Sequence, residues 1–159
     1  MVQFTLITVG TLKEAYLKEA VGEYKKRLLQ YARVDEINLK EETIKNEDDR
    51  AEIKKALSLE GERIIAAIPK DSAVIALCVE GKEFDSVALA ARISEFADAK
   101  GKITMIIGSS HGMCDEVKAK ADLKLSISKL TFPHQLIRPM IMEIVYRSFT
   151  IISGKKYHK

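Results

Sequence analysis

The chain has 159 residues, of which 47% are hydrophobic and 31% charged, and this length suits one domain with a substantial core. No apolar run reaches the roughly 20 residues of a membrane helix, and the start Met1-Val2-Gln3-Phe4 lacks the pattern of a signal peptide. A formal net charge of +3 permits an RNA partner without requiring one. We therefore expect a cytoplasmic globular protein whose two cysteines, Cys78 and Cys114, stay reduced.

Predicted strands and helices alternate along the chain. Runs of β-branched and apolar residues indicate strands over residues 4–9, 34–39, 74–79, 103–107 and 123–127. Apolar residues at helical spacing indicate helices over residues 12–29, 50–67, 85–99, 115–121 and 133–150. The alternation predicts a parallel α/β sheet covered by helices on both faces. Because ligands of such sheets bind beyond the carboxyl ends of the strands, the ends after Val79, Ile107 and Ile127 become the candidate site.

Four local features modify this pattern. Thr11 is a candidate cap for the first helix. The segment 40–49 holds five acidic residues, and we expect it to be a mobile, solvated loop. Gly61 weakens the middle of the second helix. Pro139 predicts either a kink near Gln135 or a last helix that starts later, because proline lacks the N–H of the helical ladder.

The stretch from Ala121 to Gln135 is the part around which we expect the rest to be organised. A short strand runs there into a polar loop, and Pro133 then opens a long helix with a wide apolar stripe. Backbone groups at such a junction are available to a small ligand. The loop 108–112 lacks the spacing of a dinucleotide fingerprint, and no catalytic triad or metal-ligand spacing stands out. His134 is open to either a chemical or a packing role.

Three segments have a distinctive residue order: 126–138 (SISKLTFPHQLIR), 143–147 (EIVYR) and 154–159 (GKKYHK). Together they resemble the ribosomal RNA large subunit methyltransferase H family. Smaller matches are found at Val9-Gly10, at Leu77 with Gly81-Lys82, and at Ile107-Gly108. The similarity covers essentially the full length, and a Phe-Pro-His-Gln segment combined with a Tyr-His-Lys terminus is highly specific.

The resemblance implies one SPOUT-class domain over residues 1–159, a parallel α/β fold whose C-terminal part forms a trefoil knot. Patterning alone does not predict a knot, because threaded chains are rare. The resemblance also implies a homodimer that uses S-adenosylmethionine, with no metal. The implied reaction is N3-methylation of a pseudouridine in 23S rRNA of the assembled ribosome.

Carried onto this chain, the resemblance assigns cofactor positions at the same three strand ends: Leu77, Gly108, Ile127, Ser128, Lys129, Leu130, Thr131 and Phe132. The apolar members would wall the adenine, while backbone groups of the loop fix its edge. Gly108 would let the backbone approach the ligand, which a Cβ would obstruct.

For the chemistry, His158 is the candidate base that takes the N3 proton, and Tyr157 is the candidate that orients it or stacks on the target base. In a dimer the tail of one subunit can complete the site of the other. Alternatively, the tail is an ordering clamp that touches no proton. The candidates for RNA phosphates are Arg138, Arg147, Lys129 and Lys159. Arg138 can instead support the knot or the dimer through hydrogen bonds.

The chain departs from the family pattern at three positions. Ser109 replaces a second glycine, Cys78 stands where an acidic residue is common, and Pro139 replaces an aliphatic residue. These changes affect cofactor geometry more than fold. Two rival interpretations therefore remain: a SPOUT methyltransferase acting on another RNA such as tRNA, and an RNA- or nucleotide-binding α/β module without catalysis.

Overall fold

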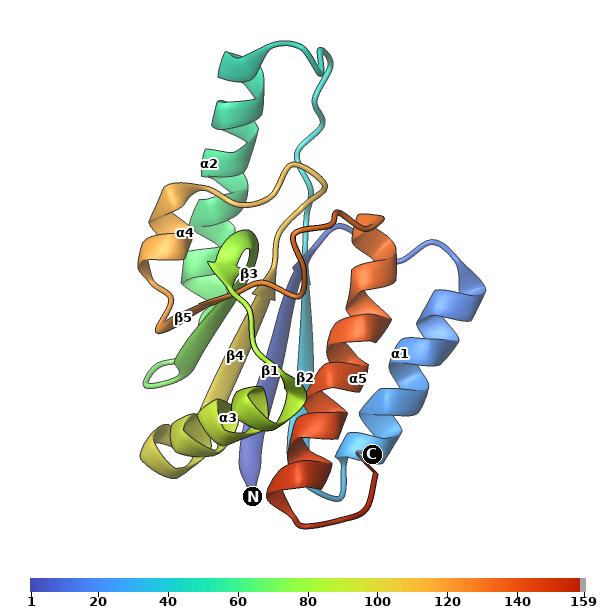
Figure 1. Ribbon diagram of the computed structural model, residues 1–159. Helices are drawn as coiled ribbons and strands as arrows, with labels where there is room; N and C mark the ends of the chain where they lie inside the picture. Colours follow the sequence, from blue (N-terminus) through green and yellow to red (C-terminus); the bar gives the residue numbers. More distant parts are fainter. Residues whose placement is uncertain (158–159) are drawn as a thin grey trace.

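The computed structural model, which describes residues 1–157, contains a five-stranded parallel sheet with helices on both faces (Figure 1). The strands are β1 (Val2–Val9), β2 (Ala32–Leu39), β3 (Ala73–Lys82), β4 (Lys102–Ile107) and β5 (Leu123–Leu125). The helices are α1 (Ala15–Leu28), α2 (Arg50–Ala67), α3 (Ser86–Lys100), α4 (Asp115–Ala119) and α5 (His134–Ile152). The strand order is β2-β1-β4-β3-β5, and every pairing is parallel, as the alternating pattern predicts.

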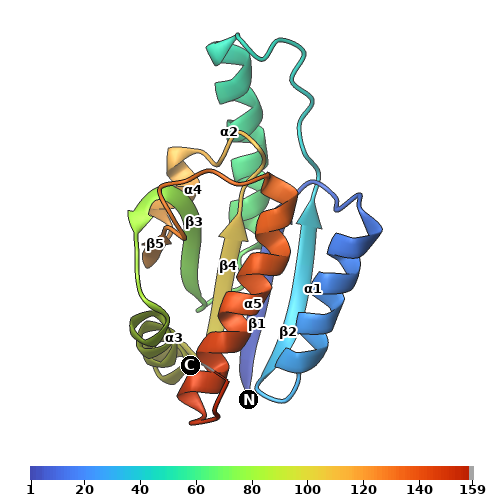
Figure 2. The ribbon, with the colours of Figure 1, turned by 45° about the vertical axis from the view of Figure 1, so that its right-hand side comes forward.

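The sheet separates two apolar cores. Helices α1, α3 and α5 cover one face, where α5 lies between the other two, and α2 and α4 cover the other (Figures 1 and 2). Successive strand side chains point to opposite faces, so Phe4 and Leu6 of β1 enter the first core while Ile7 and Val9 enter the second. No helix among the described residues is both long and apolar enough to span a bilayer.

Side-chain caps set two of the helix starts. The Asp49 carboxylate accepts the N–H groups of Ala51 and Glu52 at 3.0 and 3.2 Å, and Asp85 accepts that of Ala88 at 2.7 Å. The prediction that Thr11 caps the first helix is wrong. α1 begins at Ala15, where the preceding Glu14 makes no side-chain cap bond.

Two predicted weak points do not interrupt their helices. Gly61 lies within an unbroken α2, and a Cβ there would overlap the Sγ of Cys114. The glycine therefore lets α2 approach the segment that leads into α4. α5 begins at His134 and continues through the buried Pro139, so the alternative of a later start is wrong.

An irregularity between β3 and β5 shapes the carboxyl end of the sheet. Leu125 pairs with both Leu77 and Lys82, so the residues between them leave the ladder and form an arch. β5 ends at Leu125, two residues before the predicted end at Ile127. Gly81 closes the arch, where a Cβ would lie 2.7–2.8 Å from backbone atoms of the facing strand.

Substitution of Gly81 by alanine is expected to lower the free energy of unfolding by about 1–3 kcal/mol, because the atoms it would meet are backbone and cannot rotate away. Gly22→Ala is the matched control. Gly22 is exposed within α1, no atom lies within 4 Å of its added Cβ, and alanine is the better helix former. Urea unfolding would measure both variants. Equal stability of the two would contradict the close approach at Gly81.

Candidate functional site

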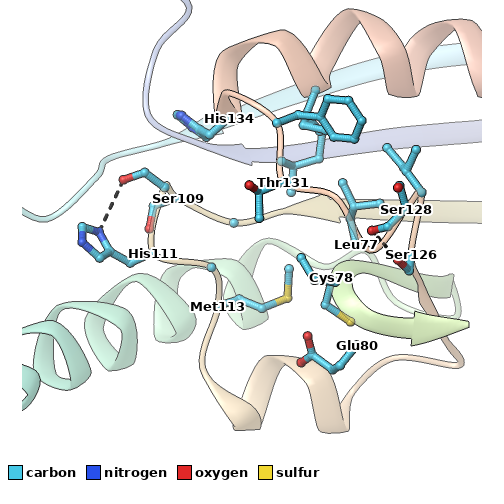
Figure 3. A pocket seen from close by; sticks show the side chains of 18 of the residues that line it. Leu77, Cys78, Glu80, Ser109, His111, Met113, Ser126, Ser128, Thr131 and His134 are labelled. Carbon is cyan, nitrogen blue, oxygen red and sulfur yellow. Dashed lines mark hydrogen bonds between the residues drawn. The ribbon is translucent and has the colours of Figure 1, made fainter.

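The three predicted strand ends meet at one cavity of about 400 Å³, within the range of small-molecule sites (Figure 3). Its wall comes from the arch after Leu77, the turn after β4 and the loop from β5 to α5. Seven of the eight cofactor candidates lie on this wall: Leu77, Gly108, Ile127, Ser128, Leu130, Thr131 and Phe132. The eighth, Lys129, is exposed and does not line the cavity.

Two serine side chains build the loop that follows β5. Ser126 is 3% exposed, and its hydroxyl donates to the Ser128 carbonyl at 3.0 Å. The Ser128 hydroxyl in turn accepts the N–H of Leu130 at 3.1 Å. Such side-chain bonds compete with the strand ladder, so the chain turns here instead of continuing to Ile127. Ser126 is not among the predicted site residues, although a Ser-x-Ser pair directly after a strand is a turn signal.

The start of α5 is clamped to the end of β1. His134 Nε2 lies 3.3 Å from the Val9 carbonyl oxygen, and Arg138 Nη2 donates to the same oxygen at 3.0 Å and to that of Gly10 at 2.9 Å. The Gln135 side chain accepts the N–H of Lys13 at 3.0 Å. The polar residues of the Phe-Pro-His-Gln segment thus contact one loop. For His134, this contact favours the packing role over a chemical one.

The burial of Arg138 bears on its two candidate roles, which are contact with an RNA phosphate and structural support. The residue is 3% exposed and makes no ion pair within residues 1–157. Burial lowers the pKa of its guanidinium, while Glu41 and Glu36 act in the opposite direction. Burial of this kind favours structural support over the expected contact with an RNA phosphate.

The turn after β4 forms the opposite wall. Ser109 and Gly112 exchange backbone hydrogen bonds of 3.1 and 2.9 Å, which close a tight turn. A Cβ on Gly108 would overlap the Gly112 carbonyl, so this position requires glycine for the turn itself. This reason differs from the expected close approach to a ligand.

A buried carboxyl group lies behind this turn. Glu60 of α2 is 3% exposed and accepts the N–H of Glu42 at 3.1 Å. Burial raises the pKa of the Glu60 carboxyl, an effect that hydrogen bonds from the Glu42 backbone and the Ser109 side chain oppose. Glu60 is not among the predicted site residues, because an acidic residue in a helix is typical of a solvent-exposed position.

The side chains that line the cavity are better suited to binding a ligand than to acting as nucleophiles. Cys78 lines the cavity, but burial raises the pKa of its thiol, and a protonated thiol is a poor nucleophile. At the rim, Lys118 pairs with Glu80. Apolar side chains and loop backbone make up much of the remaining surface.

The predicted catalytic tail lies away from this cavity. Tyr157 donates to Glu143 at 3.2 Å, its ring packs edge-on against Tyr146 at 5.0 Å, and the Arg147 guanidinium lies 4.8 Å from its centre. Its partners at positions 143–147 lie in the middle of α5, about 13–20 Å along the helix axis from the first residue, His134. Arg147 also pairs with Glu143 at 2.5 Å. The candidates His158 and Lys159 lie outside the described residues.

Comparison with known proteins gives concordant matches. The family described as predicted SPOUT methyltransferase matches residues 2–158. The chain is 46% identical over 156 residues to the ribosomal RNA large subunit methyltransferase H of Bacillus pumilus, and 44% identical over 156 residues to the putative enzyme of that name from Methanococcus maripaludis. Each alignment covers 98% of both chains. A probable methylase family protein from Haemophilus influenzae shares the fold, with a TM-score of 0.55, 16% identity, and coverage of 100% of this chain and 72% of that one.

The raised pKa of Glu60 predicts a pH-dependent stability. A carboxyl group whose folded pKa lies above its unfolded value favours the folded state more when it is protonated, so wild type should gain stability relative to Glu60→Gln as the pH falls from about 7 to about 5. Urea unfolding at both pH values measures this difference. Glu62→Gln, an exposed neighbour on the same helix, is the control. A difference that is independent of pH would contradict the raised pKa.

Proposed function

Because the chain belongs to the SPOUT methyltransferases, and among them to the ribosomal RNA large subunit methyltransferase H family, we propose that it methylates N3 of a pseudouridine in 23S rRNA of the assembled ribosome. The observation that carries the proposal is the cavity at the carboxyl ends of β3, β4 and β5, whose wall includes seven positions assigned to the cofactor by family resemblance. A ribosomal substrate implies reaction in the cytoplasm.

The residues of the cavity fit S-adenosylmethionine. Leu77, Ile127, Leu130 and Phe132 would surround the adenine, and the backbone of the loop that the two serines build would bind its edge. When bound, S-adenosylmethionine supplies an electrophilic methyl group on a sulfonium. The protein then has to align the target nitrogen with that methyl group and to exclude water. A rigid cavity wall would favour the alignment by holding the cofactor in one orientation.

The target nitrogen must also lose its proton. We assign the acceptance of this proton to the imidazole of His158, with Tyr157 orienting it or stacking on the target base. The titratable groups on the described cavity wall are engaged otherwise. Burial favours the protonated Cys78 thiol, Glu80 pairs with Lys118, His134 contacts the Val9 carbonyl and His111 contacts Glu47.

This assignment requires a homodimer in which the tail of one subunit completes the cavity of the other. Tyr157 packs against the middle of its own α5 and does not line the cavity, which supports this arrangement. Exposed apolar side chains that a second copy would cover include Tyr16 of α1, Leu136 of α5 and Leu130 at the cavity rim. Family membership likewise supports one SPOUT domain over residues 1–159 with a C-terminal trefoil knot.

Substrate recognition would combine a few cations with the shape of the ribosome. Lys129 is exposed beside the cavity, and with Lys159 it is the candidate for phosphate contact. Arg147 is already paired with Glu143, so it would have to exchange this partner for a phosphate. A net charge of +3 gives only weak bulk attraction to RNA, which favours recognition of a preformed site.

Methyl transfer from labelled S-adenosylmethionine to ribosomes that lack the modification tests the reaction. The expected product after nucleoside analysis is 3-methylpseudouridine, formed on ribosomes more than on free rRNA. Label in tRNA instead would favour the other-RNA alternative. Cofactor binding without transfer to any RNA would favour a binding module and overturn the proposed reaction.

Mixed dimers test whether the tail acts on the partner's cavity. Gly108→Ala should disrupt the turn that walls the cavity, and His158→Ala should remove the base, so each homodimer should lose at least about tenfold in activity, or 1.4 kcal/mol. In a heterodimer of the two variants, the His158→Ala subunit keeps an intact cavity and the Gly108→Ala subunit keeps an intact tail. If the tail acts in trans, this tail completes that cavity. Purified heterodimers should then show about half of the wild-type activity, since one of two equal sites is restored. Inactive heterodimers would place the tail on its own subunit's cavity.

A further inference from the structure

We propose that Glu47 and His111 are positioning residues for the methyl donor, through which the acidic segment 40–49 braces the turn after β4. The inference rests on the proposed function, because it assigns the cavity to S-adenosylmethionine. It assigns a role to segment 40–49, which is remote in sequence from every predicted site residue.

The base of segment 40–49 is fixed to α2. Arg63 donates to the Lys40 carbonyl at 3.0 Å and pairs with the Glu42 carboxylate. The buried Glu60 accepts the Glu42 N–H, as described above. These contacts hold a segment that the sequence alone predicts to be a mobile loop.

The remainder of the segment is fixed at the start of the same helix. The Glu52 carboxylate accepts the N–H groups of Lys45 and Asn46 at 2.6 and 3.2 Å. The cap residue Asp49 follows directly. Glu47 therefore extends from backbone that is held on both sides.

Glu47 reaches the cavity wall through one contact. Its carboxylate lies 2.5 Å from Nε2 of His111, which is 64 residues away in the chain. His111 lies on the turn after β4 and lines the cavity, and its Nδ1 is 3.4 Å from the Ser110 hydroxyl (Figure 3). A carboxylate can only accept at this distance, so Nε2 carries the proton and donates it. The ring orientation is thereby fixed.

The geometry of the turn matters because its backbone forms one wall of the cavity. The turn is closed internally by only two backbone bonds, between Ser109 and Gly112. His111 lies between those two residues, so holding its ring also limits rotation of the turn. Because the Glu47 side chain is 68% exposed, the expected effect on cofactor affinity is modest.

The affinity for S-adenosylmethionine, measured by titration calorimetry, tests the pair. Glu47→Ala and His111→Ala should each raise the Kd about three- to fivefold, and the double variant should bind no worse than the weaker single variant. The value of kcat at saturating cofactor should stay at the wild-type level. Glu47→Gln should restore the Kd to within about twofold, because an amide oxygen still accepts the imidazole N–H.

Asp48→Ala is the matched control, since it removes the neighbouring carboxylate. Asp48 is exposed, and within the described residues its carboxylate makes no hydrogen bond or ion pair. Its Kd should stay at the wild-type value, and its thermal midpoint should equal that of Glu47→Ala. Additive effects in the double variant, or a Glu47→Ala affinity equal to that of Asp48→Ala, would overturn the inference. Failure of the wild type to bind the cofactor would instead overturn the proposed function.

Discussion

The carbonyl oxygen of Val9 joins the two halves of the structure. It lies at the end of β1, an interior strand of the sheet, and it receives hydrogen bonds from His134 and Arg138 at the start of the last helix. The loop from β5 must therefore cross the ends of the strands before it reaches α5. The cavity exists because this loop is held at both ends, by Ser126 at one and by the Val9 contact at the other.

Burial of an arginine costs hydration free energy, and the hydrogen bonds of Arg138 explain why its burial is tolerated. Arg138 loses most of its hydration, which is why its pKa is lowered. Its charge-assisted bonds to two backbone carbonyls offset part of this loss. Both bonds come from a single nitrogen, Nη2, while the buried Nε has no hydrogen-bond partner among the described residues. The same burial that makes Arg138 a support removes it from RNA.

The last helix, α5, links the cavity to a cluster of aromatic side chains. Its first turn closes the cavity, and its second half carries Tyr146 and Arg147, against which the Tyr157 ring packs. Tyr157 is not among the residues that line the cavity. The opposite face of the sheet has a comparable arrangement, in which α2 fixes the acidic segment that reaches the turn after β4.

Residue patterning alone predicted the helices and strands, and it predicted which strand ends line the cavity. Strand and helix types depend on apolar periodicity and capping within short windows, so the parallel sheet and the meeting of its strand ends could be predicted from residues such as Val74–Val79 and Ile103–Ile107. The cofactor positions at Leu77, Gly108 and residues 127–132 stay a prediction from family resemblance. Only the tertiary structure decided the burial of Arg138, the partner of Glu47 and the contact of Tyr157 with Glu143. Each of these depends on contacts between residues that are close only after the chain has folded, and no short window of sequence contains both partners.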